Sequence, residues 1–212
     1  MVLIHSVLYF QLKPMEKGFT LLELLIVIGI LAILSTTMLL VINPAEMLRK
    51  ARDSQRISDL NTLKTAISFY LLNVSSPSIG ATGQTYSDVG GVTCFGTASP
   101  AASSTYLSIS GNGWIPINFS ALTGGSPIHA LPRDPNPSTA STGNHYYVYG
   151  VKSATDYTFK LVTNMESIAF SLNGSNDVES KDGGTNNSLY EVGTDLSLAI
   201  TTGTNCFNVG TP

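Results

Sequence analysis

The sequence predicts an α+β protein in which a long N-terminal helix packs, through its second half, against a small antiparallel sheet. Three observations lead to this prediction. An uncharged apolar run covers residues 24–42, an apolar stripe at intervals of three and four residues follows it, and short aromatic and β-branched runs separated by Gly, Ser, Thr, Asn and Pro fill the remainder. A helix with one apolar stripe needs a partner layer, which the sheet supplies.

The uncharged run of 19 residues, 24–42, is long enough to cross a bilayer as a helix. At 1.5 Å per residue it spans roughly 29 Å, close to the thickness of the hydrocarbon core. Without its flanks, such a run is a single membrane anchor or an uncleaved signal. The apolar stretch 2–12 is too short and too interrupted to span.

The residues before this run are arranged unlike a secretory signal. Lys17, Gly18 and Phe19 precede the apolar stretch and Glu23 lies at its start, whereas a secretory signal has its small-residue cleavage site after the stretch. A carboxylate that faces lipid is costly, so Glu23 needs a partner. Two partners are open: the positive end of its own helix dipole, or the amine that a cut before Phe19 would create. Taken alone, Glu23 would be an interfacial carboxylate that reaches the headgroups.

This block resembles the prepilins, the family that type IV pilins share with type II secretion pseudopilins. The resemblance rests on a basic residue, Gly18, Phe19 and a Glu four positions after the Phe, all before the anchor. It implies that a prepilin peptidase cuts between Gly18 and Phe19 on the cytoplasmic side and N-methylates Phe19. It also implies that Glu23 pairs with the Phe19 amine of a neighbouring subunit, which selects the register of assembly.

The resemblance also implies a domain order, partners and a location. The expected segments are a leader over 1–18, a transmembrane and assembly helix over 19–43, an amphipathic ectodomain helix over 44–72, and a β-rich pilin head over 73–212. We expect residues 1–14 to be a mis-assigned start, because Met15 begins a complete short leader; a long natural leader is the alternative. The implied partners are other pilins in a homo-polymer or co-polymer, the prepilin peptidase, a membrane assembly platform with its ATPase, and the bilayer before assembly. The protein would cross the inner (cytoplasmic) membrane once and then enter an extracellular filament, the periplasm or the cell surface.

The second helix follows Asn43-Pro44, where proline should kink or locally open the helix. Pro44 either lets the helix melt as it packs into a filament, as the resemblance implies, or is a plain boundary between two helices. From Ala45 to about Leu72 the pattern is helical, and its apolar stripe consists of Ile57, Leu60, Leu63, Ile67 and Tyr70. The charged residues nearer the membrane are expected on a solvated face: Arg49, Lys50, Arg52, Asp53, Arg56 and Asp59.

The head beyond Asn73 contains several strand candidates. The strongest lie at 114–119, 145–151 and 157–163, and the last two form a natural hairpin around the turn 152–156. Weaker candidates lie at 188–192 and 196–201. The stretches 75–87 and 173–187 are expected to be loops.

Two acidic groups in the head are weak metal candidates. Asp134 lies in Leu131-Pro132-Arg133-Asp134-Pro135, which resembles a segment before the sheet of several pilins and major pseudopilins. It either caps a turn or contributes to a calcium site. Asp177, Glu179 and Asp182 form a second cluster, but their spacing matches no EF-hand loop. We therefore expect a solvated loop there and no cofactor, with calcium as the alternative.

Cys94 and Cys206 are the only cysteines. Beyond a membrane anchor the setting is oxidising, and two cysteines can pair in one way. A bridge would tie the last residues back to the head, as C-terminal disulfide loops do in many pilins; two buried free thiols are the alternative.

The sequence contains no recognisable catalytic arrangement. The three histidines lie in no motif, and there is no P-loop, G-x-S-x-G or zinc spacing. The net charge of −3 gives no electrostatic argument for nucleic-acid binding. We therefore expect not an enzyme but a structural subunit of a type IV pilus or related filament, and the Ser/Thr/Gly-rich C-terminal half favours the pilus. The alternatives are a type II secretion pseudopilin, which shares the same N-terminal machinery, and a membrane-tethered binding protein whose anchor merely resembles a prepilin.

Overall fold

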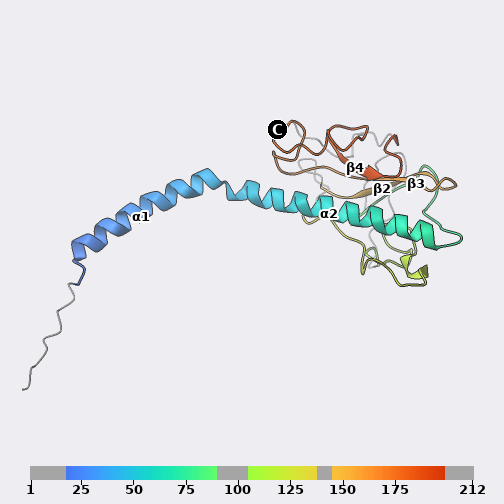
Figure 1. Cartoon of the computed structure of the whole chain (residues 1–212), viewed down its shortest axis with the longest axis horizontal. Helices are drawn as coiled ribbons and strands as arrows, with labels where there is room; N and C mark the ends of the chain where they lie inside the picture. Colours follow the sequence, from blue (N-terminus) through green and yellow to red (C-terminus); the bar gives the residue numbers. More distant parts are fainter. Residues whose placement is uncertain (1–17, 90–104, 138–144, 199–212) are drawn as a thin grey trace, which may run out of the picture. The chain divides into compact units, whose positions relative to one another are not determined.

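The computed structural model describes residues 18–89, 105–137 and 145–198, which divide between two units, Met1–Asn43 and Pro44–Pro212 (Figure 1). The first unit contains one helix, α1 (Leu21–Ile42). The second contains a helix, α2 (Pro44–Asn73), and a sheet of four strands. The prediction of an α+β fold with a long apolar N-terminal helix and an antiparallel sheet is confirmed.

The two helices are separated by one residue, Asn43. Its backbone is left-handed, with φ 43° and ψ 76°, and this conformation ends α1. α2 then begins at Pro44, where a missing N–H costs nothing because the first helical positions have no intrahelical acceptor. α1 therefore ends and α2 begins at Asn43-Pro44, the dipeptide where the sequence predicted a kink or a local opening of the helix.

α2 has 30 residues and buries one face between Asp53 and Tyr70. Leu60, Leu63, Ile67 and Tyr70 of the predicted stripe are buried, whereas Ile57 is only half-buried. The prediction of a solvated charged face is wrong for Asp53 and Arg56, which are 0% exposed. Both are buried because loops of the head supply partners for their charges, as described below.

The sheet is an antiparallel meander in the order β1-β2-β3-β4. Its strands are β1 (Thr85–Ser87), β2 (Val148–Ser153), β3 (Thr158–Thr163) and β4 (Tyr190–Gly193). The predicted hairpin is confirmed as β2–β3, with a bulge between Val151 and Ser153. β1 lies within the stretch 75–87 that was expected to be a loop, so that expectation is wrong for its last three residues; Tyr86 pairs with Tyr149 of β2.

The strand predicted at 114–119 is absent. Pro116 interrupts this stretch and has no N–H for a ladder, so pairing is reduced to an isolated bridge between Ser110 and Asn118. The 3₁₀ turn η1 (Phe119–Ala121) follows at once. Of the weak candidate at 196–201, residues 196–198 form a turn and the others lie outside the described residues.

The main core lies between α2 and one face of the sheet. Leu63 and Ile67 of α2 share a cluster with Tyr149 of β2 and Phe159 of β3, and with Trp114 from the preceding loop. A smaller cluster lies on the opposite face of the sheet and contains Val89, Tyr146, Val148, Val162 and Leu189. The alternation of the strand side chains between these two clusters is the period of two expected for a sheet covered on both faces.

Candidate assembly site

The start of α1 holds Glu23 in a capping box. Thr20 is the N-cap residue, and its Oγ1 accepts a hydrogen bond from the backbone N–H of Glu23 at 3.2 Å. In return the Thr20 N–H and hydroxyl donate to Oε2 of Glu23 at 2.8 and 2.9 Å. This reciprocal arrangement satisfies donors that the helix itself leaves unpaired. Of the two partners predicted for Glu23, its own helix N-terminus is the one present within the single chain.

The residues on either side of the expected cut are exposed. Phe19 is 84% exposed, and a Cβ added at Gly18 would meet no heavy atom within 4 Å. Gly18 therefore fills no packing role in the described chain. The peptide bond between the two residues is accessible to an enzyme acting on an extended segment.

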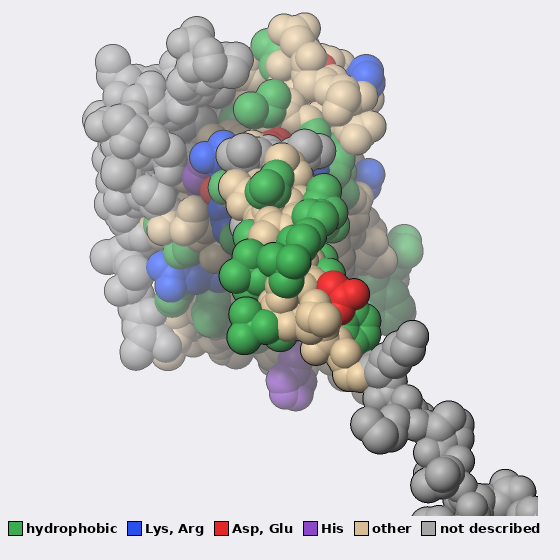
Figure 2. Space-filling model, turned by 90° about the vertical axis from the view of Figure 1, so that its left-hand side faces the viewer, with side chains coloured by type: hydrophobic (Ala, Val, Ile, Leu, Met, Phe, Trp, Pro, Cys, Tyr) green, Lys and Arg blue, Asp and Glu red, His purple; other side chains and the backbone are tan. Residues whose placement is uncertain are grey.

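α1 is the one helix of the described chain that is long and apolar enough to cross a membrane, over Leu21–Met38. Apolar side chains gather on it in Figure 2, and among the described residues they have no packing partner, Ile33 for example being 68% exposed. Its three hydroxyl side chains, Ser35, Thr36 and Thr37, donate to backbone carbonyls three or four residues earlier at 2.7–2.9 Å. Their donors are satisfied inside the helix, as a lipid environment requires.

A buried ion network fixes the first half of α2 to the head. Arg56 donates to both carboxylate oxygens of Asp134, from Nε at 2.7 Å and from Nη2 at 2.8 Å. Its Nη1 donates to Asp53 at 2.6 Å and to Glu166 at 3.3 Å. Asp53 in turn accepts the backbone N–H groups of Glu166 and Ser167 at 2.9 and 2.7 Å. The network joins α2 to two loops of the head.

Asp134 therefore has a structural partner. Besides its two bonds from Arg56, its Oδ1 accepts the N–H of Asn136 at 2.8 Å, so the prediction that it caps a turn is confirmed. Its own N–H donates to Asp88, which also accepts the N–H of Tyr147. Burial raises the pKa of Asp88 to about 7 against these two hydrogen bonds. Sequence reasoning missed Asp88, a carboxylate that joins the end of β1 to two other segments.

The signal for Arg56 and Asp53 is present in the sequence. The buried positions 53, 56, 60, 63, 67 and 70 form one series with alternating spacings of three and four. Asp53 and Arg56 continue the apolar stripe, whereas Ile57 lies beside it. Two opposite charges three residues apart on the extension of a buried stripe are a pattern for a buried ion pair.

The second acidic cluster organises its loop, and the prediction of a solvated loop is wrong for Asp177 and Glu179, which are buried. Asp177 accepts hydrogen bonds from Asn173 and from the backbone and hydroxyl of Ser180. Glu179 is 4% exposed and accepts the N–H groups of Met165 and Leu172, while burial raises its pKa to about 7. Asp182 accepts two backbone N–H groups. Within the described ranges, no group of three or more His, Cys, Asp or Glu side chains is placed to hold a metal ion.

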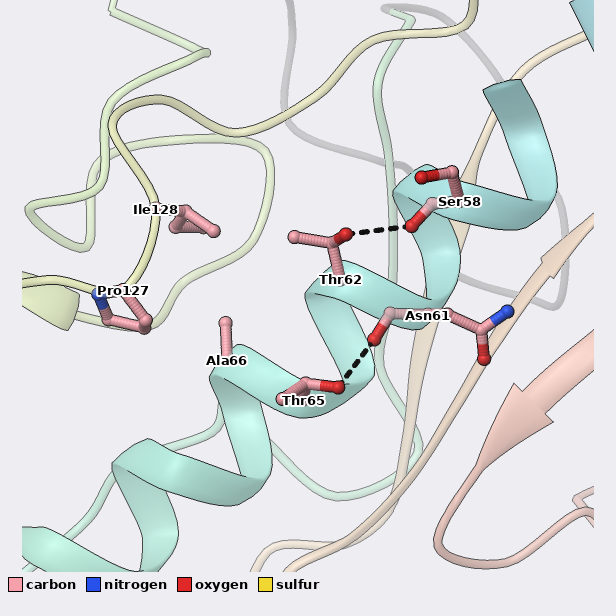
Figure 3. A pocket seen from close by; sticks show the side chains of 7 residues that line it. All are labelled: Ser58, Asn61, Thr62, Thr65, Ala66, Pro127 and Ile128. Atoms are coloured by element: carbon pink, nitrogen blue, oxygen red, sulfur yellow. Dashed lines mark hydrogen bonds between the residues drawn. The ribbon is translucent and has the colours of Figure 1, made fainter. Parts of the chain in front are cut away.

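A groove of about 350 Å³ lies between α2 and the loop at 127–128 (Figure 3). Its α2 wall carries hydroxyls that are already engaged: Thr62 and Thr65 donate to the carbonyls of Ser58 and Asn61 at 2.8 Å. Its lining contains no ionisable side chain and consists of Ser58, Asn61, Thr62, Thr65, Ala66, Pro127 and Ile128. Such a lining offers hydrogen bonding and contact but no acid–base chemistry. Cys94 and Cys206, and with them the predicted disulfide, lie outside the described residues.

Comparison with known families identifies the N-terminal segment. Residues 13–39 match the prokaryotic N-terminal methylation motif. Over these residues the chain is similar to the N-terminus of a prepilin. The motif is the hallmark of type IV pilin and pseudopilin prepilins, and the match contains Gly18, Phe19 and Glu23 together with most of α1. Comparisons with curated proteins and with solved structures each found no significant match. The prepilin match ends at residue 39, so it describes the junction and α1, while the head is described by its structure alone.

Proposed function

We propose that the chain is a structural subunit of a type IV pilus or a related filament. It is inserted in the membrane as a prepilin, cleaved after Gly18, methylated at Phe19 and polymerised through α1. The observation that carries this proposal is the methylation motif over residues 13–39, which coincides with an exposed junction and a helix able to cross a membrane. No part of this role requires the chain to be an enzyme.

The geometry of Glu23 supports a role in subunit pairing. Both hydrogen bonds to its carboxylate from Thr20 are made to Oε2, so among the described residues Oε1 is left available to another chain. Cleavage before Phe19 would create a cationic amine at the start of each subunit. Glu23 can then keep its cap through Oε2 and accept the Phe19 amine of a neighbour at Oε1. In a low-dielectric bundle, registers that leave either charge unpaired are penalised.

The apolar surface of α1 supports polymerisation from the membrane. α1 exposes large apolar side chains throughout Leu21–Met38, and none of that span is buried by the described residues. Protein contacts in a helical core replace lipid contacts of the same apolar character, so leaving the bilayer costs little in hydrophobic terms. In the filament the heads would lie outside this core. The partners are then the prepilin peptidase, other pilins, and a membrane platform with its ATPase.

The proposal is tested by comparing two glycine variants in cells that carry the assembly machinery. A Cβ added at Gly18 or at Gly29 would meet no heavy atom within 4 Å, so Gly18→Val and Gly29→Val leave the fold of the chain intact. We expect the wild type and Gly29→Val to be cleaved, and the wild type to appear in sheared, immunogold-labelled surface filaments. Gly18→Val should stay in the membrane uncut. Filaments built from uncut Gly18→Val chains would contradict the proposal, and cleaved wild type confined to the envelope would favour the pseudopilin.

A further inference from the structure

Exposed apolar side chains gather where α2 begins. Met47 and Leu48, in the first turns of α2, are 56% and 61% exposed, and Ile168 in the loop after β3 is 64% exposed. A group of exposed apolar side chains marks an interaction or membrane-contact site, and within the described residues nothing covers these three.

Ile168 belongs with Met47 and Leu48 because its loop is tied to the same end of α2. The N–H of Ala169 donates to Glu46 at 3.3 Å, and Arg52 binds Glu166 with hydrogen bonds of 2.7 and 2.5 Å. In Figure 1 this loop lies beside the first turns of α2. Ile168 and Met47 thus each adjoin one residue of the hydrogen-bonded pair Ala169–Glu46.

Chain connectivity places this end of α2 near a bilayer. The candidate span ends at Met38, α1 ends at Ile42, and Met47 is five residues further. A 22-residue α1 is about 33 Å long, slightly more than the hydrocarbon core, so Pro44 would emerge among the headgroups. Met47 is three residues into α2, about 5 Å along its axis. This distance holds whatever angle the two units adopt.

The charges beside the apolar residues favour an anionic lipid surface. Arg49 and Lys50 are exposed next to Met47 and Leu48, and the side chain of Arg49 is 45% exposed. The acids of this region are engaged. Glu46 is 15% exposed in its side chain, pairs with Arg49 and accepts the Ala169 N–H, and Glu166 binds Arg52. Apolar side chains flanked by basic ones are the composition of segments that lie in the interface of anionic membranes.

We propose that Met47, Leu48 and Ile168 form a membrane-contact surface that holds the head of the unassembled subunit on an anionic bilayer, with Arg49 and Lys50 on phosphate headgroups. The inference rests on the proposed function in one respect, that α1 spans the membrane. It adds a second attachment, made by the head itself. Assembly would then have to detach this surface as well as extract α1.

The test uses the full-length chain in vesicles of phosphatidylcholine and phosphatidylglycerol that contain lipid brominated near the headgroup end of its acyl chains, a short-range quencher of tryptophan. Three variants each add one tryptophan to the buried Trp114, which is 2% exposed. Ile168→Trp probes the surface. Leu72→Trp is the matched control, because Leu72 is 85% exposed but lies 24 residues beyond Leu48, about 36 Å along α2. Leu31→Trp, in α1, is paired with lipid brominated deep in its chains and reports whether α1 is inserted.

We expect Ile168→Trp to be quenched at least twice as strongly as Leu72→Trp, and the difference to shrink when Arg49 and Lys50 are both changed to Glu. If Leu31→Trp is quenched while Ile168→Trp behaves like Leu72→Trp, the surface is refuted and the membrane helix stands. If Leu31→Trp is not quenched, the membrane insertion on which both proposals depend is refuted. Protection of Ile168→Trp only in assembled filaments would assign this surface to a neighbouring subunit and would overturn the lipid contact.

Discussion

Replacing Arg56 by Met removes the cation at the centre of the buried network. The Arg56 guanidinium is 0% exposed and makes two hydrogen bonds to Asp134, at 2.7 and 2.8 Å, and one to Asp53, at 2.6 Å. Methionine preserves much of the side-chain volume, so the principal loss is electrostatic. The variant leaves the carboxylates of Asp53 and Asp134, 0% and 2% exposed, without their cation. Breaking a buried pair in this way costs about 3–5 kcal/mol of unfolding free energy.

The assay is urea unfolding of the full-length chain in detergent, followed by the fluorescence of Trp114. This tryptophan is the only one in the sequence and is packed in the main core, so its signal reports the head. Arg49→Met is the matched control, because Arg49 is another arginine of α2 but its pair with Glu46 is long, 3.7 Å, and its own side chain is 45% exposed. Such a pair contributes about 0–1 kcal/mol.

A second substitution distinguishes charge from shape. Adding Asp134→Asn to Arg56→Met removes one of the two uncompensated charges, so the double variant should be more stable than Arg56→Met alone. The reasoning is refuted if Arg56→Met costs no more than Arg49→Met, or if the double variant loses the sum of the two single losses.

Three further predictions concern the junction, the buried acids and the cysteines. Glu23→Val should be cleaved but should assemble poorly, and Glu23→Gln should also assemble poorly although its amide oxygen retains the cap. Between pH 5 and 7 the folded head keeps protons on Asp88 and Glu179 that the unfolded chain has released, because burial raises both pKa values to about 7. The two groups therefore lower stability as pH rises to 7, and Asp88→Asn or Glu179→Gln should flatten that fall in urea titrations. Cys94 and Cys206 should form one disulfide, so that alkylation of the non-reduced, denatured protein adds no mass.

Each of these has a clear contrary result. Normal filaments from Glu23→Gln would mean that the cap alone matters and that the charge does not. Burial lowers the pKa of His145, so this group raises stability as pH rises. The effect of Asp88 and Glu179 is therefore measured as the difference in stability between each variant and the wild type. An identical loss between pH 5 and 7 in the wild type and both variants would contradict the assigned pKa values. Two alkyl groups on the non-reduced chain would mean two free thiols.

The elements that the sequence predicted well are those set by local pattern. α1 follows from an uncharged apolar run and α2 from apolar residues spaced by three and four. The hairpin β2–β3 has two dense strand runs around a short polar turn, so its pairing is also local. The junction was recognisable because its residue types and order are specific, and the methylation motif agrees with it.

The elements that were missed depend on distant partners. β1 is only three residues long and exists because β2 offers an edge more than 60 residues later in the sequence. The spacing of Asp53 and Arg56 continues the apolar stripe, but nothing near them in the sequence shows which residues neutralise them, because Asp134 and Glu166 lie on distant loops. At 114–119 the apolar character was correct, and Trp114 and Ile117 are buried, but Pro116 prevents a ladder.

The most direct test of the account is the N-terminal sequence and intact mass of the protein recovered from its native membrane and from sheared surface material. We expect the sheared protein to begin with N-methylated Phe19 and the membrane to contain the uncut precursor as well. A chain that starts before Gly18 in every fraction, or one cut within α1, would contradict it. Either result would leave the protein a tethered or secreted domain and would remove the filament from its function.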